Sequence, residues 1–334
     1  MTKYNFIRQF ATVLLGYFLC AQAYAQHTTE FLFLESAEDY VRNTMQVNAK
    51  ALFMEINRAY DENRSGLTLS SNNVTNEAIR NIQSLWATSH FYCTETSITT
   101  RVLKSSTGFQ VRNIPVFIVQ GKTDEDRYQD IVVEFTADGK VSDMYIAIAP
   151  HQYANIMAYS NEVTDLRYRQ MIVELVENFR TAYNRKDIPF LNDIFSEDAL
   201  IITGKVLKVQ QRADIPVAYN KTQIEYSVHN KKSYLANLQR IFNANAYLNI
   251  KFDEIVVTRH EGNPNIYGVT LKQYWNASGG YSDEGWLFLM IDYGDENNPL
   301  IWVRTWQPFT DPNTGKEVRY NTEDIFGLGS FPVR

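Results

Sequence analysis

The sequence predicts an α+β protein with two domains in tandem, each with helices first and antiparallel strands last. The chain of 334 residues is long enough for two hydrophobic cores. Helical periodicity gives way to β-branched and aromatic runs twice along it. Short anchors also recur in the same order in both halves: Ala59-Tyr60 and Ala182-Tyr183, Arg101–Lys104 and Lys205–Lys208, and a strand-ending proline at Pro150 and Pro308.

The first 25 residues have the pattern of a secretory signal peptide. A basic start with Lys3 and Arg8 is followed by the apolar run 10–21 and an A-x-A cleavage site at 23–25. The apolar run is too short to cross a membrane, and no later stretch approaches the length of a membrane span. We therefore expect residues 1–25 to be removed and the protein to be exported to a periplasm or cell envelope.

Composition excludes several classes of function. The net charge of −6 and the lack of a long basic run argue against nucleic acid or an anionic membrane as partner. The five histidines are scattered, and the sequence has no metal-binding or phosphate-binding motif. We therefore expect no metal and no other cofactor.

Cys93 is the only cysteine after the signal peptide. Its apolar neighbours predict a buried small hydrophobe rather than a nucleophile.

The first domain is predicted to span residues 40–157. An amphipathic helix is expected at 39–63, and a second helix follows, for which Thr75 or Asn76 can be the N-cap. Asp138-Gly139 is a typical hairpin turn between the last two strands. A linker is expected at 151–164. The strands of this domain are expected at 97–103, 111–120, 130–135 and 141–148.

The second domain is predicted to span residues 162–310. An amphipathic helix presents Ile172, Phe179 and Tyr183 on one side and polar residues on the other. A short helix capped by Asp187 follows, and a loop is expected at 209–230 before a third helix. We expect the tail, 311–334, to pack or dock. The strands are expected at 199–203, 250–258, 267–275, 285–293 and 300–306.

A family resemblance is visible in the second half. The segments Phe179–Asn184 and Ile194–Ala199, with Asp187 between them, resemble the nuclear transport factor 2-like (cone-fold) superfamily. The runs 285–289 and 302–306 resemble its paired long strands. The resemblance covers 162–310 well and 43–150 more loosely. The whole chain also resembles exported tandem proteins of this type from Bacteroidetes-like bacteria, whose function is generally unassigned.

The resemblance implies two tandem cone-like domains, in each of which helices pack on a curved antiparallel sheet. Such a sheet wraps around the helices and leaves a cone-shaped pocket. In related isomerases and dehydratases this pocket holds acidic, histidine or tyrosine residues in apolar surroundings. In other members it binds a ligand or forms a dimer or partner surface, so the fold does not decide the function.

The alternation of side chains along the last two strands indicates candidate residues for a ligand pocket. If the side chains of the last two strands share a face, Asp292 and Arg304 lie among large aromatic rings. Arg304 would then anchor an anion or carbonyl, and Asp292 would act as an orienter or base. A structural ion pair at a domain or dimer interface is the other interpretation. The pocket candidates are Asp292, Arg304, Trp286, Trp302, Trp306, Tyr183 and Tyr274.

These observations favour an exported, non-enzymatic module that binds a small apolar ligand or an unknown protein partner. The alternative is a cofactor-free lyase or isomerase that acts on a small apolar molecule in the second domain. Such an enzyme would use an Asp/Tyr pair there. A structural role, in which the domains pair or the chain forms a homodimer, is a third interpretation.

Overall fold

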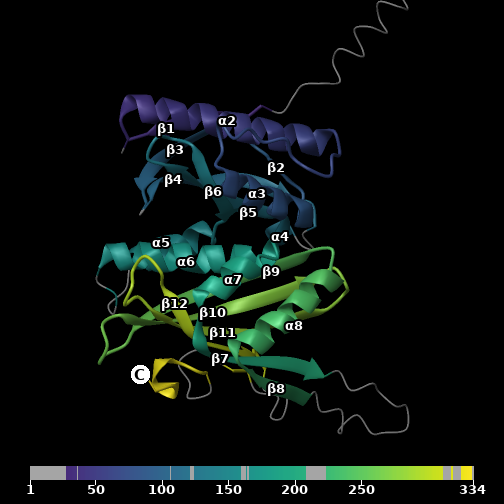
Figure 1. Ribbon diagram of the computed structural model, residues 1–334, viewed down its shortest axis with the longest axis vertical. Coiled ribbons are helices and arrows are strands. Elements are labelled where there is room, and N and C mark those ends of the chain that lie inside the picture. Colours follow the sequence, from purple (N-terminus) through teal and green to yellow (C-terminus); the bar gives the residue numbers. More distant parts are fainter. Residues whose placement is uncertain are drawn as a thin grey trace, which may run out of the picture.

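The computed structural model describes residues 28–35, 37–105, 107–120, 124–158, 163, 165–207, 223–310, 317–318 and 325–332. The predicted signal peptide, residues 1–25, lies outside them. Figure 1 shows the layers stacked along the long axis: helix α2, the first sheet, helix α6, the second sheet and the C-terminal segment. Within the described part of the chain, no helix is long and apolar enough to cross a membrane.

Six strands form the first sheet. Its order is β1-β3-β4-β5-β6, and β2 pairs with β4. The strands are β1 (Glu30–Leu34), β2 (Phe91–Cys93), β3 (Ser97–Lys104), β4 (Gly108–Ile118), β5 (Tyr128–Thr136) and β6 (Val141–Ile146). Strands β1 and β2 were not predicted, and β1 runs parallel to β3, so the sheet is mixed rather than purely antiparallel.

Three helices accompany this sheet: α2 (Asp39–Asp61), α3 (Asn76–Thr88) and the short α4 (Asp124–Arg127). Helix α2 buries Leu52, Phe53 and Ile56 against one face of the sheet. Thr75 caps α3 as predicted, because its side chain accepts a hydrogen bond from the Ala78 amide. Cys93 is buried in the same core, as expected.

The second sheet also has six strands, in the order β8-β7-β12-β11-β10-β9. The strands are β7 (Phe195–Leu207), β8 (Gln223–His229), β9 (Leu248–Arg259), β10 (Ile266–Ala277), β11 (Ser282–Asp292) and β12 (Leu300–Pro308). Strands β12 and β7 are parallel, and the other pairs are antiparallel. Strand β8 occupies part of the segment predicted as a loop.

Helices α5 (Pro150–Ala158), α6 (Leu166–Asn184), α7 (Ile188–Ile194) and α8 (Lys231–Ala244) belong to the second half. The predicted linker at 151–164 was wrong in part, because α5 is a helix that packs on α6 and β9. Helices α6, α7 and α8 cover one face of the sheet, which we call the inner face. Two α+β domains in tandem, each with helices on a sheet, are therefore confirmed.

Helix α6 lies between the two sheets, as Figure 1 shows. Its apolar side packs on the second sheet, and its polar side meets the first domain. Glu177 of α6 forms an ion pair with Arg112 of β4. Arg180 of α6 donates hydrogen bonds to the carbonyl of Ala147 and to that of Ile250 in β9. The polar side that the sequence placed opposite the core is thus an interface between the domains.

The C-terminal segment covers the other face of the second sheet, which we call the outer face. Phe326, Leu328 and Phe331 pack on a cluster that includes Phe288 and Met290. The Phe288 and Phe331 rings are stacked with centroids 5.9 Å apart. Residues 325–332 therefore pack on the domain, as one of the two expectations for the tail proposed.

Candidate ligand-binding cavity

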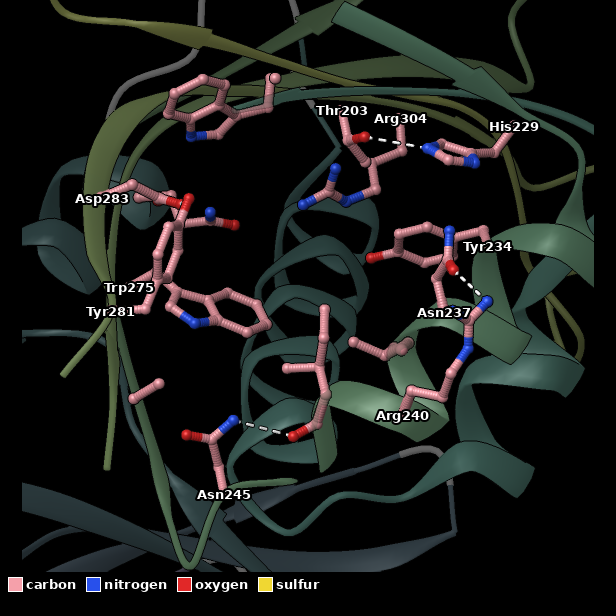
Figure 2. Close-up of a pocket in the computed structure, with 16 residues that line it drawn as sticks. Thr203, His229, Tyr234, Asn237, Arg240, Asn245, Trp275, Tyr281, Asp283 and Arg304 are labelled. Carbon is pink, nitrogen blue, oxygen red and sulfur yellow. Dashed lines mark hydrogen bonds between the residues drawn. The ribbon is translucent and has the colours of Figure 1, made fainter. Parts of the chain in front are cut away.

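A cavity of about 470 Å³ lies in the second domain, between helix α8 and the inner face of the sheet. In Figure 2, Arg304 and Tyr234 point into it from one side, and Asp283 and Trp275 lie on the opposite side. The lining residues are Thr203, Gly204, His229, Tyr234, Asn237, Leu238, Arg240, Ile241, Asn245, Gln273, Trp275, Ala277, Tyr281, Asp283, Arg304 and Trp306.

The strand register explains why these side chains meet. Residues directly opposite each other in an antiparallel pair share a face. Arg304 is paired with Leu289 of the inner core, and Trp275 is paired with Asp283. Gly285 lies next to these pairs, and a Cβ there would come within 2.7 Å of the Trp306 ring. The glycine therefore leaves the space in which the Trp306 indole lies.

Arg304 is the main charged group of the cavity wall. Its side chain is buried, and its guanidinium carbon lies 5.4 Å from the centre of the Tyr234 ring. Its Nε and Nη1 atoms have no hydrogen-bond partner among the described residues. A guanidinium keeps its proton in proteins, so burial leaves a charged donor with unused N–H groups. The Nε1 atom of Trp306 is likewise buried and without a partner in the described structure.

Two tyrosines whose hydroxyl groups contact each other lie beside this wall. The hydroxyl groups of Tyr183, on α6, and Tyr234, on α8, are 2.6 Å apart. Burial raises the pKa of Tyr183 well above its ordinary value, so the phenol is neutral. His229 lies 3.0 Å, Nε2 to Oγ1, from Thr203. Burial, and then the charge of Arg304, lower the pKa of His229 below 6.5, so its imidazole is neutral at pH 7.

An acidic group lies on the opposite wall. Asp283 accepts a hydrogen bond from the Tyr281 hydroxyl at 2.6 Å through Oδ2, whereas its Oδ1 is buried and has no partner among the described residues. Burial raises the pKa of Asp283, although the Tyr281 hydrogen bond and the Arg304 charge act in the opposite direction. No ion pair joins Asp283 and Arg304, so both groups remain available to a molecule between them.

The predicted pocket residues lie on two different faces of the second sheet. Arg304 and Trp306 line the cavity, and Tyr183 touches it through Tyr234. The expectation that Asp292 and Arg304 share a face was wrong, because Asp292 lies opposite Ile266 of the outer cluster in the strand register. The other candidates also lie outside the cavity. They pack on the outer face, where Trp286 and Tyr274 contact Phe309 and Trp302 contacts the outer cluster.

Register accounts for this separation. Strand alternation correctly grouped Trp286 with Asp292 and Arg304 with Trp306, but it did not indicate which groups share a face. In the pairing of β11 with β12, Leu287 lies opposite Trp306, so the odd-numbered residues of this part of β11 face inward with Arg304. A register shift between Met290 and Ile291 then places Trp302 with the outer cluster.

Several cavity residues could not be recognised from the sequence. His229 lies in a predicted loop, and Tyr234 was treated as part of a helix core. Trp275 and Asp283 fall at the end of one predicted strand and just before the next. Alternation on β10 could have placed Gln273 and Trp275 on one face, but the α8 contribution depends on tertiary packing. Among the described residues, no group of three or more His, Cys, Asp or Glu side chains could hold a metal ion.

Helices on the inner face of a curved, mainly antiparallel sheet, with a cavity at the α8 end, form the arrangement that the sequence resemblance implied. This is the arrangement expected of a nuclear transport factor 2-like fold. No protein-family model and no curated protein matches the chain. Three matching solved structures are at most 16% identical to the chain.

Bd1075 from Bdellovibrio bacteriovorus is 16% identical, and the match covers 44% of this chain and 42% of that one, with a TM-score of 0.32. An NTF2-like protein of unknown function from Pseudomonas putida KT2440 is 10% identical, with coverage of 46% and 94% and a TM-score of 0.32. ActVI-ORFA from Streptomyces coelicolor is 11% identical, with coverage of 42% and 96% and a TM-score of 0.30.

Proposed function

We propose that this protein is an exported, non-enzymatic module that binds a small, largely apolar molecule in the cavity of its second domain. One observation supports this function above the others. Buried donors of Arg304 and Trp306, without partners among the described residues, face a cavity whose walls include Trp275 and Leu238. Buried polar groups are nearly always hydrogen-bonded, so donors of this kind favour a bound molecule.

The cavity is of a suitable size for this role. Pockets for small molecules typically enclose a few hundred Å³ and combine apolar walls with a small number of polar groups. Here Trp275, Trp306 and Leu238 are buried and supply the apolar surface. The proposal of export depends on residues 1–25 and is tested separately, by N-terminal sequencing of the secreted chain.

Ligand-detected and protein-detected NMR with a library of small apolar molecules tests the binding function. We expect hits to shift the indole N–H resonances of Trp275 and Trp306. The variant Ile241→Trp should reduce these shifts, because Ile241 lines the cavity and is 41% exposed. Val228→Trp is the matched control, since Val228 is exposed and does not line the cavity. A library that perturbs neither indole would contradict the function.

A cofactor-free lyase or isomerase is the second candidate, and Asp283 is the observation that favours it. A carboxyl group whose pKa is raised by burial, beside a tyrosine and inside a cavity, is suited to proton transfer. Exchange of deuterium into the α-carbon of cyclohexanone provides a measurement. Exchange that is faster with wild type than with Asp283→Asn would favour catalysis, and equal rates would favour binding alone.

A further inference from the structure

We propose that the ligand of the second-domain cavity carries a carboxylate at one end, bound by Arg304 and Trp306, and a hydroxyl or amine at the other, bound by Asp283. The inference rests on the proposed binding function and specifies its ligand class. It identifies the ligand as an aromatic or apolar monocarboxylic acid with one additional hydrogen-bond donor.

The carboxylate end follows from the donors on one wall. Arg304 offers two N–H-bearing atoms, Nε and Nη1, on one planar group, and neither has a partner in the described structure. Nε and Nη1 lie on different edges of the guanidinium, so each can donate one charge-assisted hydrogen bond to an anionic oxygen, and such bonds are stronger than neutral ones. Trp306 adds an indole N–H, which can only donate. This wall therefore favours a ligand group that only accepts.

Arg304 is the only buried cation among the described residues that line the cavity. His229 is neutral at pH 7, as described above, and its Nε2 is engaged with Thr203. Arg240, the other arginine of the lining, is exposed and donates to the Asn237 side chain. One buried positive charge faces the space, so a single negative charge neutralises it.

The opposite wall selects for a donor. Asp283 keeps Oδ1 buried and without a partner among the described residues, while Tyr281 satisfies Oδ2. A carboxylate oxygen accepts hydrogen bonds, so a ligand hydroxyl or amine can complete its bonding. Figure 2 places Asp283 and Arg304 on facing sides of the cavity. A molecule between them meets a positive group at one end and a negative group at the other.

The walls between these ends fit an apolar body. The Trp275 and Trp306 indoles are 8% and 2% exposed, and Leu238 is buried beside them. Flat rings gain from offset or edge-to-face contacts with indoles, so an aromatic body is favoured over a branched aliphatic one. The ligand class is thus distinguished from sugars, nucleotides and neutral sterols by its single carboxylate.

Matched probes test the ligand class. We would measure dissociation constants by NMR titration for three probes: 3-(4-hydroxyphenyl)propanoate, its methyl ester and 3-phenylpropanoate. An indole series and a naphthalene series would each supply the same set, which is a hydroxy acid, its methyl ester and the acid without the hydroxyl. We expect each hydroxy acid to bind roughly tenfold or more tightly than its ester, as for loss of a charge-assisted hydrogen bond. Removal of the hydroxyl should weaken binding by several-fold.

Variants assign each end to its residue. Arg304→Gln should remove the preference for acid over ester, and Arg304→Lys, which keeps the charge but has a single nitrogen, should retain part of it. Asp283→Asn should remove the preference for the hydroxylated acid and leave the preference for acid over ester. Arg101→Met, an exposed arginine of the first domain, removes one charge far from the cavity and should change neither preference.

The outcomes separate the inference from the function on which it rests. Esters that bind at the cavity as tightly as acids, or acids that bind equally to Arg304→Gln and wild type, would overturn the ligand class and leave the binding function intact. If no member of any series, acid or ester, perturbs the Trp275 and Trp306 resonances, both are overturned.

Discussion

Arg112 of the first domain and Glu177 of helix α6 form a buried ion pair across the junction between the two domains. Arg112 Nη1 lies 3.0 Å from Glu177 Oε2, and the guanidinium also stacks 4.2 Å from the centre of the Tyr153 ring. Glu177 is fully buried and accepts a further hydrogen bond from the Ile148 amide at 2.8 Å. The junction is therefore held by a polar contact with little access to water.

Arg112→Ala should destabilise the protein by about 3 to 5 kcal/mol, because it leaves the Glu177 carboxylate buried without its partner. Urea unfolding at pH 7 measures this loss. Lys50→Ala is the control, since Lys50 and Glu30 form an exposed pair, and its removal should lower the free energy of unfolding by less than about 1 kcal/mol. Similar losses in the two variants would show that the buried pair does not stabilise the junction.

The titration of Glu134 should lower the free energy of unfolding as pH rises. Burial, followed by the charge of Glu174, raises the pKa of Glu134 from 4.5 to about 8. Below pH 4.5 both folded and unfolded chains hold this proton, and the contribution to stability is complete. Between pH 4.5 and 8 the unfolded chain releases the proton while the folded chain keeps it. This group alone should then lower stability by about 1.4 kcal/mol per pH unit.

Glu134→Gln should remove that slope, because an amide can keep the contacts with Gln110 and Tyr145 without titrating. The measurement is the urea midpoint of wild type and variant at pH 5, 6.5 and 8, at constant ionic strength. We expect the variant to gain on wild type as pH rises. Two parallel pH profiles would show that Glu134 is not protonated in the folded protein.

Arg304→Met should stabilise the protein when no ligand is bound. Burial of a guanidinium with unused donors opposes folding, and a methionine of similar length packs there without a charge. We expect a gain of about 1 to 2 kcal/mol, which corresponds to roughly 2 to 4 °C in melting temperature. Differential scanning calorimetry measures it.

Arg185→Met is the matched control. Arg185 is also buried, but its Nε lies 3.0 Å from Asp187, so its removal leaves a carboxylate without its partner and should lower the melting temperature. If both variants lose stability, the Arg304 guanidinium is satisfied in the free protein, and its proposed role as a ligand anchor is weakened.

Gly285→Ala should disturb the cavity through Trp306. A Cβ at this position would lie 2.3 Å from the Gln307 carbonyl oxygen and 2.7 Å from the Trp306 ring, so the strand or the indole must shift. Such overpacking destabilises by about 1 to 3 kcal/mol. Ligand titration and thermal melting measure the two effects. Gly66→Ala, where a Cβ meets nothing within 4 Å, should change neither.

Release of the C-terminal segment, residues 325–332, should cause the protein to self-associate. Phe331→Asp should detach residues 325–332 from the outer face, because its ring stacks on Phe288. Exposed apolar patches promote self-association, so light scattering after gel filtration should detect dimers or larger species. Gly329→Asp is the control, since Gly329 is exposed and a Cβ there meets nothing within 4 Å. A monomeric Phe331→Asp protein would contradict the expectation.

Periodicity was sufficient to predict most of the fold. Helix α6, helix α7 with its Asp187 cap and the long strands β9 to β12 follow from apolar spacing and turn residues alone. Strands β1 and β2 were missed because five-residue and three-residue strands contain too little pattern to recognise. Helix α5 was missed because its sequence, after Pro150, shows only a weak apolar stripe.

The cavity was less predictable than the fold. Arg304 and Trp306 were identified from alternation within β12, since a strand determines which of its own residues share a face. Asp283 and Trp275 required the register between β10 and β11, and Tyr234 required the packing of α8 on β7. These relations are set by contacts between distant segments, which a single sequence does not encode in any local pattern.

Helix α6 has consequences for how the sequence can change through evolution. Every residue from Ile172 to Asn184 is buried or half-buried, with one sheet on each side. A substitution at Thr181, for example, affects the first domain directly, because its hydroxyl accepts a hydrogen bond from the Ile146 amide of β6. Replacement of the second half by that of a homologue would therefore require matching changes in β4, β5 and β6. The two halves must evolve together.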